Sequence, residues 1–319
     1  MDLTYPPEAE EYRTRIRAVI KRNLPEHWKG IGGLQGEERA EFMATWRKVL
    51  SDEHLLAVQW PKEYGGAGLS AVEQVVVAEE FARAGVPSGA DNDMLGINLL
   101  GNTLIVWGTE KQKENFLPRI LTADDKWCQG FSEPGAGSDL AGQRTSAVLE
   151  RGAGATTDAI RSQNDVDRLL ALAKERGKND DPHIRELLAW CYGRVELIRY
   201  RGYQTLTRFL KGQNPGPDAA FAKLLWSEFA QRYNELAVEI LGMDALTPSG
   251  PGRGGSLASP DIGAPNSSRA WVDALLTSRA GTIAAGSSQV QRNIIGEQLL
   301  GLPKEPRMDG GPFRQLVNG

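Results

Sequence analysis

The sequence contains few of the residues that form disulfides or bind metal ions. Only two cysteines, Cys128 and Cys191, occur among 319 residues, so no disulfide framework is expected and a reducing compartment, the cytoplasm, is favoured. The three histidines, His27, His54 and His183, lie far apart without a metal-ligand spacing. We therefore expect them at the surface and expect no metal site.

Long apolar runs and basic tracts are also missing. The apolar run over residues 94–106 is interrupted by Asn98, Gly101 and Asn102, so no membrane span is expected. The first residues are acidic rather than apolar, and no signal peptide is visible. A net charge of −4 argues against nucleic acid as a partner. With 40% hydrophobic and 24% charged residues, the composition is that of a globular protein with two or three domains.

The remaining pattern is predominantly helical. Ser70 and Glu73 have the spacing of a capping box, and Thr109 is expected to cap another helix. Apolar periodicity predicts helices over residues 8–23, 37–50, 71–85, 93–107, 110–121, 165–176, 182–212, 218–241, 268–282 and 287–300. Only residues 126–131 and 144–148 have the character of strands. The fold class is therefore mainly α.

One predicted helix, 218–241, carries a pronounced apolar stripe. Its members are Phe221, Leu224, Leu225, Phe229, Tyr233, Leu236 and Ile240. Such a stripe is more typical of a protein core or a subunit interface than of a cofactor site. The following residues, 247–268, are rich in Gly, Pro and Ser and are expected to form a loop.

The most informative stretch is Trp127–Asp139, WCQGFSEPGAGSD. A short apolar run precedes a sharp turn through Pro134, Gly135 and Gly137, where proline fixes φ and glycine reaches positive φ. A backbone with such small side chains suits a flat, polyanionic cofactor that lies on main-chain N–H groups. The alternative is an ordinary connection between a strand and a turn.

Four motifs in order resemble the acyl-CoA dehydrogenase family, flavoenzymes that introduce a double bond between Cα and Cβ of an acyl-CoA thioester. In chain order they are WPKEYGGAG at Trp60–Gly68, NLLGNTLIVWGTEKQKENFLPRIL at Asn98–Leu121, WCQGFSEPGAGSD at Trp127–Asp139 and GSSQVQR at Gly286–Arg292. The resemblance implies FAD as cofactor and an N-terminal helical domain (1–125). It also implies a strand and turn remnant of the middle β-domain (126–148) and a C-terminal helical bundle (149–319).

The resemblance also assigns site residues. Those expected to line the flavin are Gln129, Gly130, Phe131, Ser132, Gly135, Gly137, Ser138, Ser287, Ser288 and Gln289. Ser138 and Gly286 are expected near the substrate thioester.

Two further positions correspond to the part of the family site that a partner subunit completes. Arg176 stands where an arginine for the flavin pyrophosphate is expected, without the usual Arg-x-x-Phe-Gly context. Gly242 lies in Glu239–Met243, which replaces the family's Gln-x-x-Gly-Gly segment. Glu for Gln and Met for Gly alter this predicted contact.

The reaction needs a base for the α-proton. Many family members carry a glutamate just before the glycine of the C-terminal motif, but Ala285 stands there and cannot accept a proton. Other members use a Glu-Arg pair at the start of the helix after the central domain, which here is Glu150-Arg151. We expect Glu150 to be the base and Arg151 to bind or order the substrate. The alternative is that Glu150 is a solvated residue in a first helical turn.

The main departure from the family is the missing central β-domain. In the family, the strand after the EPGAGSD motif continues into a small β-barrel-like domain, whereas here Val148 runs directly into Leu149. One wall of the flavin site would then be absent, with lower cofactor affinity and a more exposed Glu150. Apolar surface would also be exposed where the barrel packs in the family.

Three functions are compatible with the sequence. The first is an FAD-dependent acyl-CoA dehydrogenase, of the bacterial branch that takes bulky or sterol-derived acyl-CoAs. The second is a non-catalytic helical subunit that supports an active paralogue in a mixed oligomer. The third is a protein that binds acyl-CoA without oxidising it. The resemblance further implies an electron-transfer flavoprotein as acceptor and a homo- or hetero-oligomer, dimer or tetramer.

Overall fold

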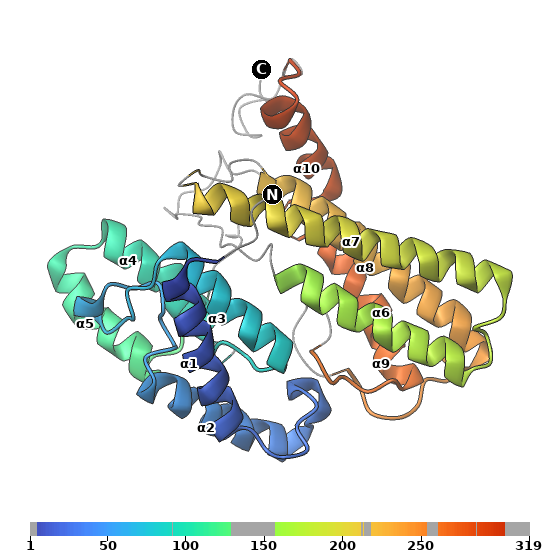
Figure 1. The fold of residues 1–319 in the computed structure, drawn as a ribbon, viewed down its shortest axis with the longest axis horizontal. Helices are drawn as coiled ribbons and strands as arrows, with labels where there is room; N and C mark the ends of the chain where they lie inside the picture. The colour runs from blue at the N-terminus through green and yellow to red at the C-terminus, as the bar shows by residue number, and fades with distance from the viewer. Residues whose placement is uncertain are drawn as a thin grey trace, which may run out of the picture. The chain divides into compact units, whose positions relative to one another are not determined.

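The computed structural model describes residues 5–90, 92–128, 157–211, 213, 218–253, 261–284 and 286–303. All regular structure in these ranges is helical, which confirms the mainly α class (Figure 1). The strand expected over 126–131 does not form at residues 126–128, and its remainder, like the strand expected over 144–148, lies outside the described residues. The chain divides into two compact units. The first comprises residues 1–49, 69–88 and 153–301, and the second 50–68, 89–152 and 302–319.

The N-terminal helices of the first unit are α1 (Pro7–Asn23), α2 (Gly36–Asp52, whose last residues belong to the second unit) and α3 (Ala71–Ala84), with a short 3-10 turn η1 (Ile31–Gly33). Ser70 caps α3 in the predicted capping box with Glu73. Aromatic rings connect α2 and α3. Phe42 stacks on Trp46, and Trp46 meets Phe81 edge-on, with 6.0 Å between ring centroids in each pair.

A buried ion cluster joins α1 to α3. The guanidinium of Arg13 donates to Glu79 at 3.1 Å and to Glu80 at 2.6 Å, and all three side chains are less than 10% exposed. Arg17 and Arg83 add further contacts from the rim. Burial alone would raise the pKa of Glu80, but hydrogen bonds from Arg17 and Arg13 hold the pKa below its usual range. The charges are therefore matched inside the interface.

The C-terminal bundle of the first unit contains α6 (Thr157–Glu175), α7 (Pro182–Leu210), α8 (Asp218–Leu241) and α9 (Ser268–Gly281), which lie alongside one another (Figure 1). A 3-10 turn, η5 (Gly242–Ala245), follows α8, and α10 (Ser288–Ile294) continues into a π-helical segment, η6 (Ile295–Leu299). The helix predicted over 165–176 begins earlier, at Thr157.

The core of this bundle confirms most of the predicted stripe on α8. Phe229, Tyr233, Leu236 and Ile240 are at most 3% exposed, whereas Phe221 is 39% exposed. They pack with buried side chains of the neighbouring helices, among them Val166, Leu169, Leu172, Leu188, Val195 and Trp271. The apolar face of α8 therefore forms core from about its middle to its end.

A buried carboxylate lies inside this core. Asp165 is 1% exposed and accepts a hydrogen bond from the Tyr233 hydroxyl at 2.9 Å. Arg168 contacts the same carboxylate at 3.4 Å and stacks on the Trp271 ring, 4.4 Å from its centroid. Burial raises the pKa of Asp165 to about 6, against the opposing effects of Arg168 and Tyr233.

The second unit contains η2 (Lys62–Tyr64), the π-helical η3 (Met94–Gly101), α4 (Asn102–Trp107) and α5 (Glu110–Thr122). Thr109 caps α5, as predicted. Trp60 of the WPKEYGGAG loop is fully buried and donates from Nε1 to the Ile97 carbonyl at 3.2 Å. A Cβ on Gly101 would lie 1.9 Å from its ring, so this motif packs the unit together through a close contact that only glycine permits.

No helix in the described part of the chain is both long and apolar enough to cross a membrane.

Replacing Arg13 with Met should lower the free energy of unfolding by about 3 kcal/mol, because Glu79 and Glu80 would remain buried with less counter-charge. Arg17→Met is the control. The Arg17 side chain is 59% exposed, and its loss should cost about 1 kcal/mol or less. Urea unfolding followed by tryptophan fluorescence measures both, and equal losses would contradict the buried role of Arg13.

Replacing Asp165 with Asn should change the pH dependence of stability. The folded-state pKa of Asp165 is raised to about 6. The contribution of Asp165 to the free energy of unfolding is therefore most favourable below about pH 4, and it is lost as the pH rises through 6. We therefore compare the free energies of unfolding of Asp165→Asn and wild type. The difference, variant minus wild type, should increase by about 2–3 kcal/mol between pH 4 and 7.5. A constant difference over this range, measured by urea unfolding, would refute the assignment.

Candidate functional site

The C-terminal motif Gly286–Arg292 forms a tight turn followed by the first turns of α10. Gly286 has a φ of +89°, in the left-handed region that favours glycine. The Val290 N–H donates to the Ser287 hydroxyl at 3.4 Å, so Ser287 caps α10. The Ser288 N–H donates to the Thr282 carbonyl at 3.0 Å, which folds the turn back on the end of α9.

The first two-thirds of α8 hold this turn through polar contacts. Lys223 Nζ donates to the Gly286 carbonyl at 2.7 Å, and Gln231 Nε2 donates to the Thr282 hydroxyl at 2.8 Å. Glu228 forms an ion pair with Arg292. The sequence pattern does not reveal these contacts, because polar positions on an amphipathic helix look the same whether they meet solvent or another segment.

Burial separates the residues of the motif. Ser288 is 7% exposed and Gln291 is fully buried, whereas Gln289 is exposed. The Ser288 hydroxyl has no hydrogen-bond partner among the described residues. A buried hydroxyl without a partner costs free energy unless another group satisfies it. The Ser288 hydroxyl therefore has an unused hydrogen-bonding capacity within the described part of this turn.

The other two predicted cofactor residues lie at the far end of α8. Arg176, just after α6, forms an ion pair with Asp244 of η5. Gly242 begins η5 with a φ of +58°. Nearby, His183 Nε2 lies 2.9 Å from a carboxylate oxygen of Glu239, and both side chains are exposed. These contacts link the ends of α6 and α8 and the start of α7.

The predicted residues thus form two groups that lie near opposite ends of α8. Lys223, beside Gly286, and Leu241, beside Gly242, are about 27 Å apart along the α8 axis at about 1.5 Å per residue. The two groups are therefore well separated within one chain.

The central motif and the predicted base lie outside the described residues. These positions are Gln129, Gly130, Phe131, Ser132, Gly135, Gly137, Ser138, Glu150 and Arg151, together with Ala285. The chain leading to them is anchored in the second unit. The side chain of Asn92 donates to the Trp127 carbonyl at 2.6 Å and accepts from the Trp127 N–H at 3.0 Å. Phe116 meets the Trp127 ring edge-on.

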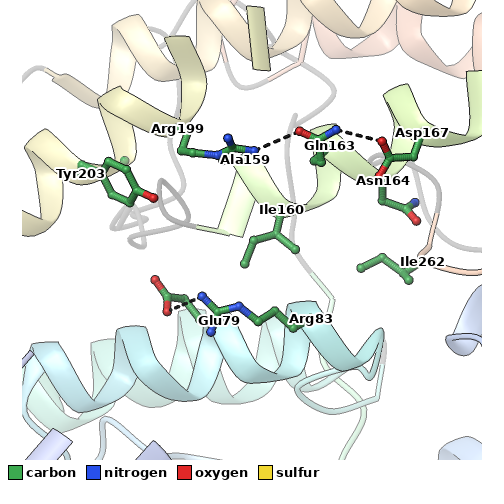
Figure 2. Close-up of a pocket in the computed structure, with 11 residues that line it drawn as sticks. Glu79, Arg83, Ala159, Ile160, Gln163, Asn164, Asp167, Arg199, Tyr203 and Ile262 are labelled. Carbon is green, nitrogen blue, oxygen red and sulfur yellow. Dashed lines mark hydrogen bonds and ion pairs between the residues drawn. The ribbon is translucent and has the colours of Figure 1, made fainter. Parts of the chain in front are cut away.

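A separate open pocket of about 410 Å³ lies in the first unit between α3, α6 and α7 (Figure 2). Its polar side chains form hydrogen bonds and ion pairs with one another. Arg83 pairs with Glu79 at 3.2 Å, Arg199 donates to Gln163 at 3.0 Å, and Gln163 donates to Asp167 at 2.9 Å. None of the predicted site residues lines this pocket, and its two arginines are balanced by two carboxylates.

Both helical parts of the chain match known protein families. Residues 6–124 match the family described as "Acyl-CoA dehydrogenase, N-terminal domain", and residues 140–300 match "Acyl-CoA dehydrogenase, C-terminal domain". Only residues 125–139 separate the two matches, which is too short a segment to form a domain.

One similar protein is acyl-CoA dehydrogenase IpdE1 of Mycobacterium tuberculosis, with 28% identity over 401 aligned positions that cover 94% of this chain and 99% of the relative. Because the alignment is longer than the 319 residues of this chain, the relative contains segments that this chain lacks.

Two solved structures share the fold. The Tcur3481-Tcur3483 steroid ACAD has a TM-score of 0.66 at 23% identity, covering 96% of this chain and all of the other. The ChsE4-ChsE5 complex from Mycobacterium tuberculosis has a TM-score of 0.65 at 22% identity, with the same coverage.

The family matches span the N-terminal helices and the C-terminal bundle and include the motif that forms the Gly286 turn. The resemblance inferred from the four motifs is therefore confirmed. The described residues contain no strand, in agreement with the expected loss of the central β-domain. The chain belongs to the acyl-CoA dehydrogenase family.

Proposed function

We propose that the chain is an FAD-dependent acyl-CoA dehydrogenase subunit that oxidises an acyl-CoA thioester between Cα and Cβ. The observation that carries the proposal is the Gly286 turn, in which a buried serine hydroxyl, without a partner among the described residues, lies beside a glycine in a left-handed conformation.

The residues of the turn fit a flavin. A flavin ring offers carbonyl oxygens and ring nitrogens, and the Ser288 hydroxyl can donate to or accept from such groups. A glycine is required at position 286 by the chain's own packing, since a Cβ there would lie 2.6 Å from Nε2 of the buried Gln291. In the proposed site, Ser287, Ser288 and Gln289 hold the cofactor, and Gly286 lies beside the substrate thioester.

FAD, when bound, supplies the acceptor for the hydride that leaves the β-carbon. The chain itself must take the α-proton, and Glu150 is the proposed base because Ala285 occupies the other family position. A carboxylate abstracts such a proton best when apolar surroundings raise its pKa towards neutrality and when it reaches the α-carbon. Arg151, next in sequence, is proposed to order the substrate.

The two groups of predicted residues near opposite ends of α8 support an oligomer. In this proposal, the Gly286 turn contacts the flavin of its own chain. Arg176 and Gly242 contact the flavin of a second subunit, because they lie near the other end of α8, about 27 Å away along its axis. Arg176 pairs with Asp244 in the single chain, so binding a partner's flavin pyrophosphate requires that ion pair to open or to be shared.

The substrate and acceptor are proposed from the relatives. One structural neighbour is named a steroid ACAD, which supports a bulky, sterol-derived acyl-CoA as the substrate of this chain. An electron-transfer flavoprotein is the proposed acceptor, as expected from the family.

The second candidate is a non-catalytic subunit of a mixed oligomer. The loss of the β-domain favours it, as do Glu239 and Met243 at the predicted partner contact. Both structural neighbours bear paired protein names. In the second unit, Val106 and Trp107 are 62% and 76% exposed, which fits a surface that another chain covers.

The visible spectrum of the purified chain separates the two candidates. After addition of excess FAD and desalting, a retained flavin spectrum that bleaches with acyl-CoA is expected for the dehydrogenase. Glu150→Gln should keep the flavin and reduce the bleaching rate at least about 100-fold, because the amide cannot accept the α-proton. Glu37→Gln, at an exposed helix start, is the matched control. A folded protein without flavin would instead support the non-catalytic subunit.

Replacing Gly286 with Ala should weaken flavin retention and cost about 1–3 kcal/mol of stability, because the new Cβ would strain the φ of +89° and meet Gln291. The control is Gly193→Ala in α7, where an added Cβ meets nothing within 4 Å and should stabilise the helix by about 1 kcal/mol. FAD titration and thermal unfolding measure both effects. Unchanged FAD affinity in Gly286→Ala would contradict the placement of the flavin.

A further inference from the structure

The carbonyl of Gly286 is the point at which α8 contacts the candidate redox site. It accepts a hydrogen bond from Lys223 Nζ at 2.7 Å and a longer one from Gln291 Nε2 at 3.4 Å. A hydrogen bond from an ammonium group is roughly twice as strong as one between neutral groups. Lys223 therefore provides the dominant restraint on this carbonyl.

The Gly286 backbone gains a restraint from a contact outside the turn. Gly286 has no side chain that limits its backbone, and glycine populates positive and negative φ about equally. Rotation of the Gly286–Ser287 peptide would move the capping serine and the buried Ser288 that follow. Fixing the Gly286 carbonyl fixes the N–H of Ser287 on the same planar peptide.

The neighbouring contacts indicate that Lys223 is not needed simply to attach this segment to α8. Gln231 holds Thr282 on one side of the turn, and Glu228 holds Arg292 on the other. Lys223 instead contacts the residue proposed to lie beside the substrate.

We propose that Lys223 is a positioning residue for the redox site, because its ammonium group, in contact with the Gly286 carbonyl, sets the orientation of the Gly286–Ser287 peptide. The proposal rests on the proposed flavin site. It adds a residue of α8 that touches neither flavin nor substrate and acts through the Gly286 peptide.

The test compares three variants of the full chain. Lys223→Met removes the donor and the charge at similar length, and Lys223→Arg restores both. Arg232→Met is the control, because Arg232 is an α8 residue with a half-exposed side chain that pairs with Glu235. FAD affinity is measured by absorbance titration, and amide hydrogen exchange of residues 282–292 is measured without flavin.

We expect Lys223→Met to bind FAD at least about tenfold more weakly and to exchange the amides of residues 287–291 at least about tenfold faster, with circular dichroism and urea midpoint unchanged. Lys223→Arg should recover both values to within about threefold, and Arg232→Met should match wild type. Wild-type FAD affinity and exchange in Lys223→Met would overturn the proposal, and so would an arginine variant as impaired as the methionine variant.

The two proposals fail in different ways. Absence of FAD binding by the wild-type chain defeats the proposed function, while the exchange measurement still decides whether Lys223 fixes the Gly286 peptide. If Lys223→Met does not fold, Lys223→Gln replaces it. Failure of both variants to fold would show that Lys223 is required for the bundle and would overturn the positioning role.

Discussion

The structure of the C-terminal bundle depends on α8, because one helix provides both the core and the supports of the candidate site. Its apolar face packs Phe229, Tyr233, Leu236 and Ile240 against α6, α7 and α9. Its polar positions hold the Gly286 turn near the start of the helix, and its end leads into the Gly242 turn. Both turns therefore inherit the rigidity of a buried helix, which gives the accurate placement that a cofactor site requires.

The loss of the central β-domain changes the physical demands on this arrangement. A flavin held only by helices and turns is less shielded from water, so hydrogen bonds to it compete with solvent and contribute less. In the proposed site, the groups that remain are few and include the Ser288 hydroxyl and the Lys223 contact behind Gly286. A second subunit is one source of the missing wall, and the separation of the two residue groups along α8 is consistent with an assembly in which subunits share sites.

Much of the fold could be predicted from periodicity and capping patterns. The helix over residues 218–241 and the caps at Ser70 and Thr109 agree with the sequence-based expectation. The helix expected over 93–107 is instead a π-helical segment followed by α4, since the apolar pattern does not distinguish these winding modes. The site could be predicted only through motifs. Of its residues, the Gly286 turn and Arg176 with Gly242 can be located in the described part of the chain.

The sequence by itself determined the helical class and the family, and it predicted the residues of the candidate site, because helical periodicity, capping and short motifs are all local in the chain. Only the tertiary structure decided which polar residues meet. Lys223 reaches Gly286 across 63 positions, and Arg176 reaches Asp244 across 68. The physical reason is that periodicity defines the face of a helix, whereas the partner of that face is selected by packing of the whole bundle.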